Sequence, residues 1–524
     1  MLREIIYFVT SLGSAGGLIA AFAIPRARPY LHSPWPVLAL GVVLIVACSR
    51  YRHLRQMRLH GTLPGTVYPH IDPILGIDWM WLLVRNHRRN RLLEMTHTFF
   101  TQSVATTYWT NILGNWMLMT CDPENFKAIM SDQSDAWDVS DTRAKSLGPA
   151  LGKSSILAVN GRLWWQARTM IRPMFSQSPV TELNCIDHVV DNCLARVRSA
   201  GDKVELKQLI YMFNLDASTK FMFGHSTNLL DNPSAASLEF RAAFSHAVIV
   251  SSTTGRLGWL APLLRGKDFH ASVATCRAYA SRYVDEAMKD EKAEGDAYFY
   301  IRKMREVGGS YEQTTDQLLT LLLVGHDTSS CVMSCLFWTL ARRPDVVRAI
   351  RQELQQLGGR RPTWQQLRGL KYLFNVYKEA LRLWTPTAFN SRTALKDLVL
   401  PKGGGPDHQS PLFVPKGTEC AVSLHSLHRL NDIFGDDAKE FRPERWESSQ
   451  TNPANWEYQP FGIGPRTCVG QQFAWTMMPY FTARFFQEYE SIEALDDDPM
   501  MLKLTAGLGL GNDCWVALTP ASTE

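Results

Sequence analysis

One cysteine of this chain lies in a loop rich in glycine and proline, Phe461–Gly470 (FGIGPRTCVG), ahead of an apolar run that resembles a helix. Glycines let the backbone turn tightly with positive φ and approach a flat ligand closely. They also leave backbone N–H groups free to point at the sulfur, and a thiolate held in this way suits an axial iron ligand. A buried structural thiol is the alternative reading of Cys468, because it is the most common state of a free cysteine.

A second group of polar residues interrupts a long apolar run between about Thr314 and Ala341. The run predicts the longest helix of the main domain, roughly 40 Å at 1.5 Å per residue, and Pro344 follows as a helix stop. Gly325–Ser329 (GHDTS) lies in its middle. Buried polar groups need partners or a purpose, so this cluster is a candidate site. A Ser/Thr-rich bend in a core helix is the alternative.

Glu379 and Arg382 are three residues apart in a predicted helix, where i and i+3 side chains lie on one face and can pair. Such pairs are common on surfaces, but the neighbouring Leu383 and Trp384 indicate burial. A buried pair needs a further partner, which Arg445 can supply. The sequence therefore predicts a structural Glu-Arg-Arg network without a chemical role.

Trp164 and Arg168 are four residues apart, so they share one face of a predicted helix. An indole N–H and a guanidinium on one face can bind carboxylates. The W-x-x-x-R spacing is frequent by chance, and it gains weight only together with the other motifs.

In their order and spacing, these motifs resemble those of the cytochrome P-450 superfamily, the haem-thiolate monooxygenases. The resemblance covers about residues 60–524, with W-x-x-x-R at 164, the polar cluster at 325, E-x-x-R at 379, P-E-R at 443 and the cysteine at 468. The five fixed positions of the cysteine loop would occur by chance in roughly one chain of this length in ten thousand. The resemblance implies a mainly α P-450 prism fold with a small β lobe, behind an N-terminal membrane anchor.

The resemblance also implies a haem b site with Cys468 as the axial ligand of the iron. Matching positions supply the other haem contacts, of which the arginines and the tryptophan face the propionates: Phe461, Gly464, Arg466, Gly470, Trp164, Arg168 and Arg392. Thr328 and Asp327 match the oxygen-activation motif and are the predicted catalytic residues. Reductive cleavage of O2 consumes protons, which these side chains can deliver through waters where Thr328 disrupts the regular hydrogen bonding of its helix.

The substrate pocket is expected to draw on residues near 130–160, 245–265, 317–328, 385–390 and 506–511. Val324 stands where the family usually has alanine or glycine, so its branched side chain should narrow the space over the haem. The named pocket candidates are Val324, Gly325, Thr387, Ala388, Phe389 and Leu508. The apolar stretch near 246–266 has two readings, plain core or the membrane-facing lip of a substrate entrance.

A glycine-rich insert, Leu400–Pro406, runs on to Phe413–Gly417 and resembles a fungal branch that includes the alkane and fatty-acid terminal hydroxylases. Members of this branch also tailor secondary metabolites. We expect insertion of one oxygen atom from O2 into a polyketide- or terpenoid-like substrate. Terminal or subterminal hydroxylation of fatty acids or alkanes is the alternative. A haem-binding protein without turnover is a third reading, against which the intact Asp327 and Thr328 argue.

The family resemblance implies electrons from NADPH through a P-450 reductase, with cytochrome b5 as an additional donor. The chain has no G-x-G-x-x-G unit in a βαβ context, so it is not expected to bind NADPH itself. A net charge of +5 is too weak to indicate nucleic-acid binding. The expected partners are therefore the reductase, a membrane and a hydrophobic small molecule.

Two apolar runs, about Ile5–Pro25 and Trp35–Cys48, begin the 524-residue chain. A membrane-spanning helix needs about 20 apolar residues, and the arginines that follow favour a cytosolic position for the rest. The expected organisation is an anchor of one or two segments (1–50), a basic, proline-rich linker (51–80) and a catalytic domain (81–524), on the cytosolic face of the endoplasmic reticulum. A cleaved signal peptide and two core helices are the alternatives.

Composition agrees with a large folded domain, because hydrophobic residues make up 45% and charged residues 20% of the chain. The ten cysteines are scattered singly, which argues against a disulfide framework and for a reducing compartment. Beyond residue 80 the pattern predicts mostly helices, including 178–200 and 205–223. Short β segments are expected near 105–120, 385–400 and 410–425, and Asp122 is expected to cap a helix that begins at Pro123.

Overall fold

The computed structural model describes residue 48 and residues 51–175, 183–255, 261–289, 298–447 and 453–522. Apart from Cys48, both N-terminal apolar runs lie outside the described residues, and with them nearly all of the predicted anchor. Residues 51–59, at the start of the predicted linker, are helical. The number of membrane spans and the division into anchor, linker and catalytic domain stay predictions.

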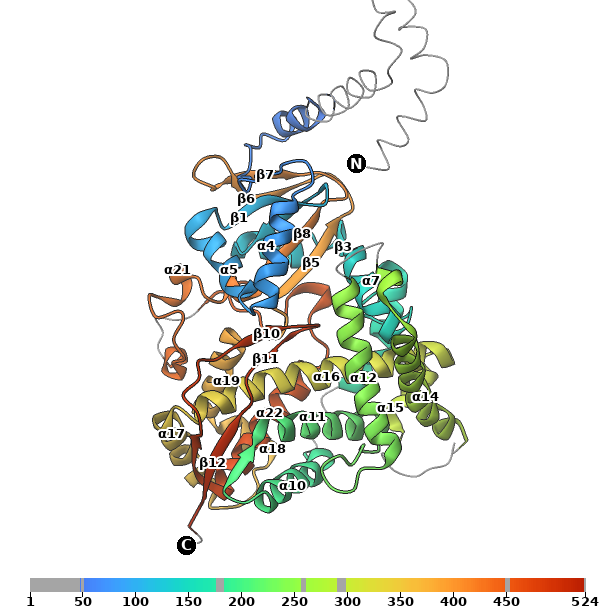
Figure 1. Ribbon diagram of the computed structural model, residues 1–524, viewed down its shortest axis with the longest axis vertical. Coiled ribbons are helices and arrows are strands. Elements are labelled where there is room, and N and C mark those ends of the chain that lie inside the picture. The colour runs from blue at the N-terminus through green and yellow to red at the C-terminus, as the bar shows by residue number, and fades with distance from the viewer. Residues whose placement is uncertain are drawn as a thin grey trace, which may run out of the picture.

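The molecule has a smaller β-rich part and a larger helical part (Figure 1). The β-rich part is built on a five-stranded sheet in the order β1-β2-β8-β5-β3, in which β2 and β8 run parallel and the other neighbours antiparallel. Its strands are β1 (Thr107–Ile112), β2 (Asn115–Thr120), β3 (Trp137–Val139), β5 (Phe389–Ala394) and β8 (Glu419–Ser423). The glycine-rich insert forms an antiparallel hairpin of β6 (Leu398–Gly404) and β7 (Ser410–Val414).

The long helix α16 (Tyr311–Leu340) crosses the middle of the molecule in Figure 1. Its 30 residues make it about 45 Å long. It begins three residues before the predicted start, because Ser310 and Gln313 form a capping box. Within the described ranges α16 is the one helix long and apolar enough to span a membrane, but 78% of its apolar window is buried in the protein. We therefore assign it as a core helix.

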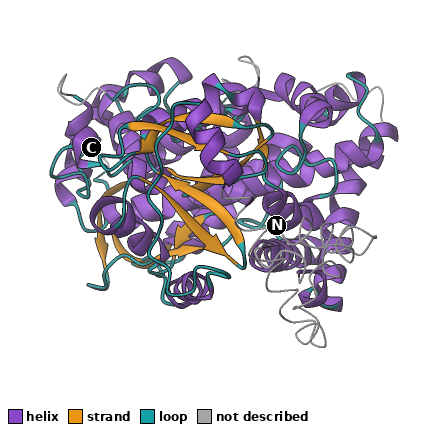
Figure 2. Ribbon diagram, turned by 90° about the horizontal axis from the view of Figure 1, so that it is seen from above, coloured by secondary structure: helices purple, strands orange, loops and turns teal. Residues whose placement is uncertain are grey.

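The helices packed against α16 include α11 (Leu206–Phe223), α14 (Lys267–Lys289), α19 (Lys371–Leu383) and α22 (Gln471–Glu488). α12 (Ala235–Gly255) lies against α14 and α7 (Asp141–Leu151). Seen from above, the strands occupy the middle of the molecule, and helices extend beyond them on both sides (Figure 2). α16 is thus enclosed by helices along much of its length.

The other helices are α4 (Ile77–Arg88), α5 (Leu92–Thr98), α6 (Pro123–Lys127), α8 (Gly161–Ile171), α10 (Asn184–Ser199), α13 (Ala261–Leu264), α15 (Phe299–Glu306), α17 (Pro344–Leu354), α18 (Trp364–Gly369), α20 (Leu424–Leu427) and α21 (Asn431–Phe434). Two small sheets complete the fold, one in the order β4-β12-β9 and one of β10 and β11. Their strands are β4 (Lys203–Glu205), β9 (Tyr489–Ala494), β10 (Leu502–Leu504), β11 (Leu508–Leu510) and β12 (Trp515–Pro520).

The predicted fold class, mainly α with a small β part, is confirmed. Asp122 caps α6 as expected, since its Oδ1 accepts from the backbone N–H groups of Glu124 at 3.0 Å and Asn125 at 2.9 Å. The strands after residue 489 were missed. The stretch near 246–266 fits neither reading alone, because Val248 is 5% exposed and Leu263 is 77% exposed; residues 256–260 lie outside the described part.

Candidate active site

A central cavity lies between α16 and the cysteine loop, and most of the predicted site residues line it. From the cysteine side these are Phe461, Arg466, Cys468 and Gly470, together with Trp164, Arg168 and Arg392. From the opposite side they are Val324, Gly325, Thr328 and Thr387. Residues more than 300 positions apart in the chain therefore line the same cavity.

Close packing sets the shape of the cysteine loop. Gly464 has φ of 72°, and a Cβ atom there would lie 2.1 Å from the carbonyl oxygen of Met130. The N–H of Cys468 donates to the carbonyl of Phe461 at 2.9 Å, which closes the loop. Gly464 does not line the central cavity. Its role is to let the backbone follow this path, because a side chain at position 464 would not fit.

The thiol of Cys468 is accessible from the central cavity, yet burial is the largest influence on its pKa and raises it. The backbone N–H of Gly470 and the guanidinium of Arg168 act in the opposite direction. Both groups stabilise a thiolate, which is the form that binds a metal. The loop thus presents an accessible sulfur with two groups that favour its charged state.

Four arginines line the central cavity beside Cys468: Arg143, Arg168, Arg392 and Arg466. Their hydrogen bonds go to neutral acceptors. Arg392 donates to Oδ1 of Asn390 at 2.7 Å, Arg466 to Oδ1 of Asn160 at 2.9 Å, and Arg168 to the carbonyl of Thr467 at 2.9 Å. No ion pair joins these four arginines to a carboxylate in the part of the chain that the structure describes.

The charge of this arginine cluster is therefore poorly compensated. Burial, together with the neighbouring Arg143 and Arg466, lowers the pKa of Arg392 to about 9. Burial likewise lowers the pKa of Arg466 to about 10. Asp138 offsets part of this effect at both arginines. The cluster thus fits a ligand that brings negative charge into the cavity, and the two propionates of a haem meet that requirement.

The indole of Trp164 completes the cluster, because the guanidinium of Arg466 lies 4.5 Å from the centre of its ring. Arg143 was missed by the sequence reasoning, which identified only its general region. No motif marks it, and it joins the cluster because α7 begins directly after strand β3.

On the opposite wall, the hydroxyl of Thr328 donates to the carbonyl of Val324, one turn earlier in α16. The helix continues without interruption through the motif, so the Thr328 hydroxyl adds a bond to the regular pattern. Gly325 faces α11, where an added Cβ would lie 2.9 Å from Oγ of Ser218. Glycine at 325 therefore also permits the close contact of the two helices.

Three of the predicted pocket residues lie elsewhere. Ala388 is 1% exposed and does not line the central cavity. Phe389 begins β5, pairs with Ser423 and packs against the hydrophobic core. Leu508 lines a neighbouring cavity instead. Ala388 and Phe389 do not line the central cavity, although Asn390 and Arg392 of the strand that begins at Phe389 do. The pocket roles of Ala388, Phe389 and Leu508 stay predictions.

Behind the cysteine side lies a fully buried ion network. Arg382 donates to both carboxylate oxygens of Glu379, at 2.9 and 2.7 Å, and Nε of Arg445 donates to the same carboxylate at 3.3 Å. The indole of Trp446 donates to it at 3.0 Å. All three charged side chains are 0% exposed. The structure thus brings together the residues of the predicted network, away from the central cavity.

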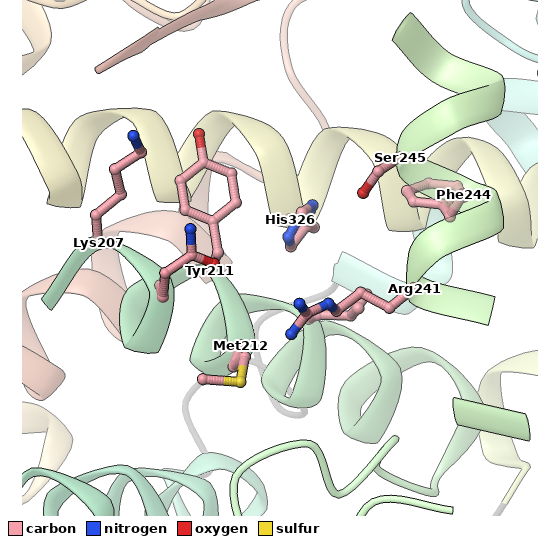
Figure 3. Close-up of a pocket in the computed structure, with 9 residues that line it drawn as sticks. Lys207, Tyr211, Met212, Arg241, Phe244, Ser245 and His326 are labelled. Carbon is pink, nitrogen blue, oxygen red and sulfur yellow. The ribbon is translucent and has the colours of Figure 1, made fainter. Parts of the chain in front are cut away.

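Two further cavities lie along α16, on the side that faces α11 and α12. The outer cavity, of about 180 Å³, is lined by Lys207, Gln208, Tyr211, Met212, Leu215, Arg241, Phe244, Ser245 and His326 (Figure 3). The intermediate cavity, of about 270 Å³, shares some of these residues and reaches Asp327, Thr328 and residues 507–511. Each has room for several waters. Thr328 lines both the intermediate and the central cavity.

His326 connects these two spaces to the predicted catalytic pair. Its Nδ1 lies 2.8 Å from Oδ1 of Asp327, and its ring meets the ring of Tyr211 edge-on at 5.4 Å. In Figure 3 it projects from α16 between Tyr211 and Ser245. Asp327 lines the intermediate cavity and not the central one. The sequence reasoning left His326 without a role, although it lies within the motif.

A cysteine loop, a buried arginine cluster and a polar turn of a long helix around one cavity define the haem-thiolate class of oxygenase. Comparison with known families agrees, because the profile described as Cytochrome P450 matches residues 74–513. This chain belongs to the cytochrome P450 family. It is an oxidoreductase of the monooxygenase type, with haem as cofactor and electrons from a redox partner.

Similar proteins include several fungal members of this family. The cytochrome P450 monooxygenase himC of Aspergillus japonicus is 35% identical over 91% of this chain and 88% of its own length. The monooxygenase fsdH of Fusarium heterosporum is 32% identical over 93% and 88%. Cytochrome P450 52A13 of Debaryomyces hansenii is 29% identical over 90% and 94%. The predicted family and its fungal branch are thereby confirmed.

Proposed function

We propose that this enzyme inserts one oxygen atom from O2 into a hydrophobic secondary metabolite of polyketide- or terpenoid-like structure. The reaction takes place in the central cavity, between Cys468 and Thr328. The arginine cluster without carboxylate partners, on the same cavity as an accessible thiol, carries this proposal. When bound, haem b supplies the iron at which O2 is activated.

The residues around the central cavity divide the task of holding the haem. Cys468 would provide the sulfur that binds the haem iron, and Phe461 and Gly470 would border it. Arg143, Arg168, Arg392, Arg466 and the indole of Trp164 would hold the propionates. Gly464 shapes the loop, while Glu379, Arg382 and Arg445 support the domain behind it.

Protons reach the central cavity through α16. His326 takes a proton from water in the outer cavity and passes it from Nδ1 to the carboxylate of Asp327. The Thr328 hydroxyl, which lies between the intermediate and central cavities, delivers it to the reaction side. To do so, Thr328 rotates away from its bond to the carbonyl of Val324. The 2.8 Å contact of His326 with Asp327 supports this order.

The substrate assignment rests on Val324, which lines the central cavity. Its branched side chain would narrow the space over a bound haem. Fatty acids or alkanes, hydroxylated at or near the chain end, are the second candidate. The intermediate cavity favours an acid with an alkyl chain, because it combines Val248 and Leu508 with Lys207 and Lys503.

NADPH-dependent P450 reductase is the proposed electron donor, with cytochrome b5 as an additional one. The proposed location is the endoplasmic reticulum membrane, with residues 1–50 as anchor, 51–80 as linker and 81–524 in the cytosol. Exposed apolar side chains support a nearby membrane, since Ile71 is 91%, Ile74 72% and Trp81 56% exposed.

Two spectra test the proposal. The reduced protein with CO should absorb at the long-wavelength Soret position of thiolate ligation, and a histidine-like spectrum would refute the role of Cys468. A screen for the low-spin to high-spin shift should then rank bulky polyketide and terpenoid scaffolds above fatty acids. A better response to fatty acids selects the second candidate, and binding without any product selects a haem protein without turnover.

A further inference from the structure

The segment 152–160, which follows α7, contributes Ile156 and Leu157 to the wall of the central cavity. One end of the segment is tied to the cysteine loop, because Arg466 donates to the carbonyl of Val159 and to Oδ1 of Asn160. The other end is tied to α16. Ile156 and Leu157 therefore lie between two fixed points.

The tie to α16 is a set of side-chain hydrogen bonds that we call the polar clamp. Oδ2 of Asp316 accepts from the N–H of Ser154 at 2.9 Å. Gln317 binds the backbone twice, since its Oε1 accepts from the N–H of Ile156 at 3.2 Å and its Nε2 donates to the carbonyl of Ser154. The hydroxyl of Thr320 donates to that of Ser155 at 2.8 Å.

The polar clamp is buried and closely fitted. Ser155 is 0%, Gln317 1% and Asp316 3% exposed. Gly152 has φ of 101°, and a Cβ atom there would lie 2.0 Å from Oδ1 of Asp316. Leaving a buried donor or acceptor unpaired costs about 1–3 kcal/mol. The segment therefore has a strong preference for this one position.

Asp316 also joins the polar clamp to helix α14. Nη1 of Arg277, in α14, donates to Oδ1 of Asp316 at 2.7 Å. α14 packs against both α12 and α16. One buried carboxylate thus links segment 152–160, α14 and α16.

We propose that Asp316 and Gln317 are specificity-determining residues, because they hold Ile156 and Leu157 at a set position in the wall of the central cavity. Neither side chain lines the central cavity, so they act as positioning residues. The inference rests on the proposed function, in which the central cavity is the substrate site. A displacement of about 1 Å in such a wall is enough to change which substrate atom reaches the oxidant.

The first test measures the position of the segment without turnover. Gln317→Met keeps the volume of the side chain and removes both bonds to the backbone. The amides of Ser154 and Ile156 should then exchange with deuterium about tenfold faster or more, since opening costs less. Asn214→Leu is the matched control, because Asn214 is a fully buried amide in α11 whose Nδ2 donates to the carbonyl of Ile210 at 2.8 Å. It replaces a buried amide at a site away from the polar clamp and should leave segment 152–160 protected.

The second test measures selectivity with two haem ligands of different size, imidazole and the N-(triarylmethyl)imidazole clotrimazole. In Gln317→Met the ratio of the two dissociation constants should shift about fivefold in favour of clotrimazole, with little change for imidazole. Asn214→Leu should keep the wild-type ratio. Faster exchange with an unchanged ratio overturns the specificity role, and unchanged exchange overturns the clamp itself. If the wild-type protein binds neither ligand at iron, the proposed function fails, and the selectivity claim fails with it.

Discussion

The two walls of the central cavity are held by different means. On the cysteine side, Gly464 is packed against a carbonyl, and a buried ion network around Glu379 lies behind the loop. On the α16 side, hydrogen bonds between distant residues hold the wall, as between Gln317 and Ser154, which are 163 positions apart. We therefore expect substitutions in the packed loop and the ion network of the cysteine side to reduce the amount of folded protein. On the α16 side we expect substitutions that alter the reaction while the fold persists.

Of the substitutions that we propose, removal of the Glu379 carboxylate should cause the largest loss of folded, haem-loaded protein. Glu379→Ala leaves Arg382 and Arg445 buried without their shared carboxylate, which costs about 3–5 kcal/mol. We expect little folded, haem-loaded protein, as measured by the CO spectrum and by thermal unfolding.

The comparison variant is Asp437→Asn at the edge of the same network, where the carboxylate is 36% exposed. Because water can reach that position, the loss should be much smaller. Equal losses in the two variants would show that burial is not what makes the cysteine side sensitive.

The second prediction concerns Gly464. Gly464→Ala combines positive φ with the clash against Met130, and we expect a loss of about 3 kcal/mol in the free energy of unfolding. Gly417→Ala is the control, because Gly417 has φ of 84° with open space around it. Gly417→Ala should lower the free energy of unfolding by about 1–2 kcal/mol, the cost of placing alanine at positive φ. A control as damaging as the test variant would refute the steric argument.

The cysteine side was predictable from the sequence because its contacts are encoded by short spacings. The loop 461–470 and the pair Glu379 and Arg382 each lie within ten residues. The polar clamp and the arginine Arg143 depend on segments that only tertiary folding brings together, so no local pattern marks them. Spacing also does not tell which side chains at the start of β5 face the central cavity, which Asn390 and Arg392 line and Ala388 and Phe389 do not.

Substitution of Arg392 should stabilise the haem-free protein and weaken its binding of haem. Arg392→Met removes a buried cation without a carboxylate partner, so the haem-free protein should gain about 1–3 kcal/mol of stability. The same change removes a propionate contact, so haem affinity should fall by about 2 kcal/mol. Arg172→Met, at an exposed position, should change neither quantity. A haem-free protein that loses stability would contradict the idea that the arginine cluster lacks countercharge.

On the α16 side, Thr328→Ala should leave the fold and substrate binding unchanged. Product formed per NADPH should fall about tenfold, which corresponds to about 1.4 kcal/mol. Without the Thr328 hydroxyl to direct proton delivery, electrons should be diverted to peroxide or water. Ser330→Ala serves as control, since Ser330 is buried in the same helix and does not line the central cavity. Unchanged yield per NADPH in Thr328→Ala would remove Thr328 from the proton path.

The smallest effect is expected at His326. His326→Gln keeps a hydrogen-bond donor beside Asp327 but cannot pass a proton through a ring, so turnover should slow about threefold. The solvent isotope effect should increase as proton entry becomes rate-limiting. Tyr211→Phe, which keeps the ring beside His326 and removes only its hydroxyl, should leave the isotope effect unchanged. If both variants behave alike, protons enter by another route, and the outer cavity is only a space between helices. If only His326→Gln responds, the α16 side carries its chemistry on residues whose loss the fold tolerates, unlike the cysteine side.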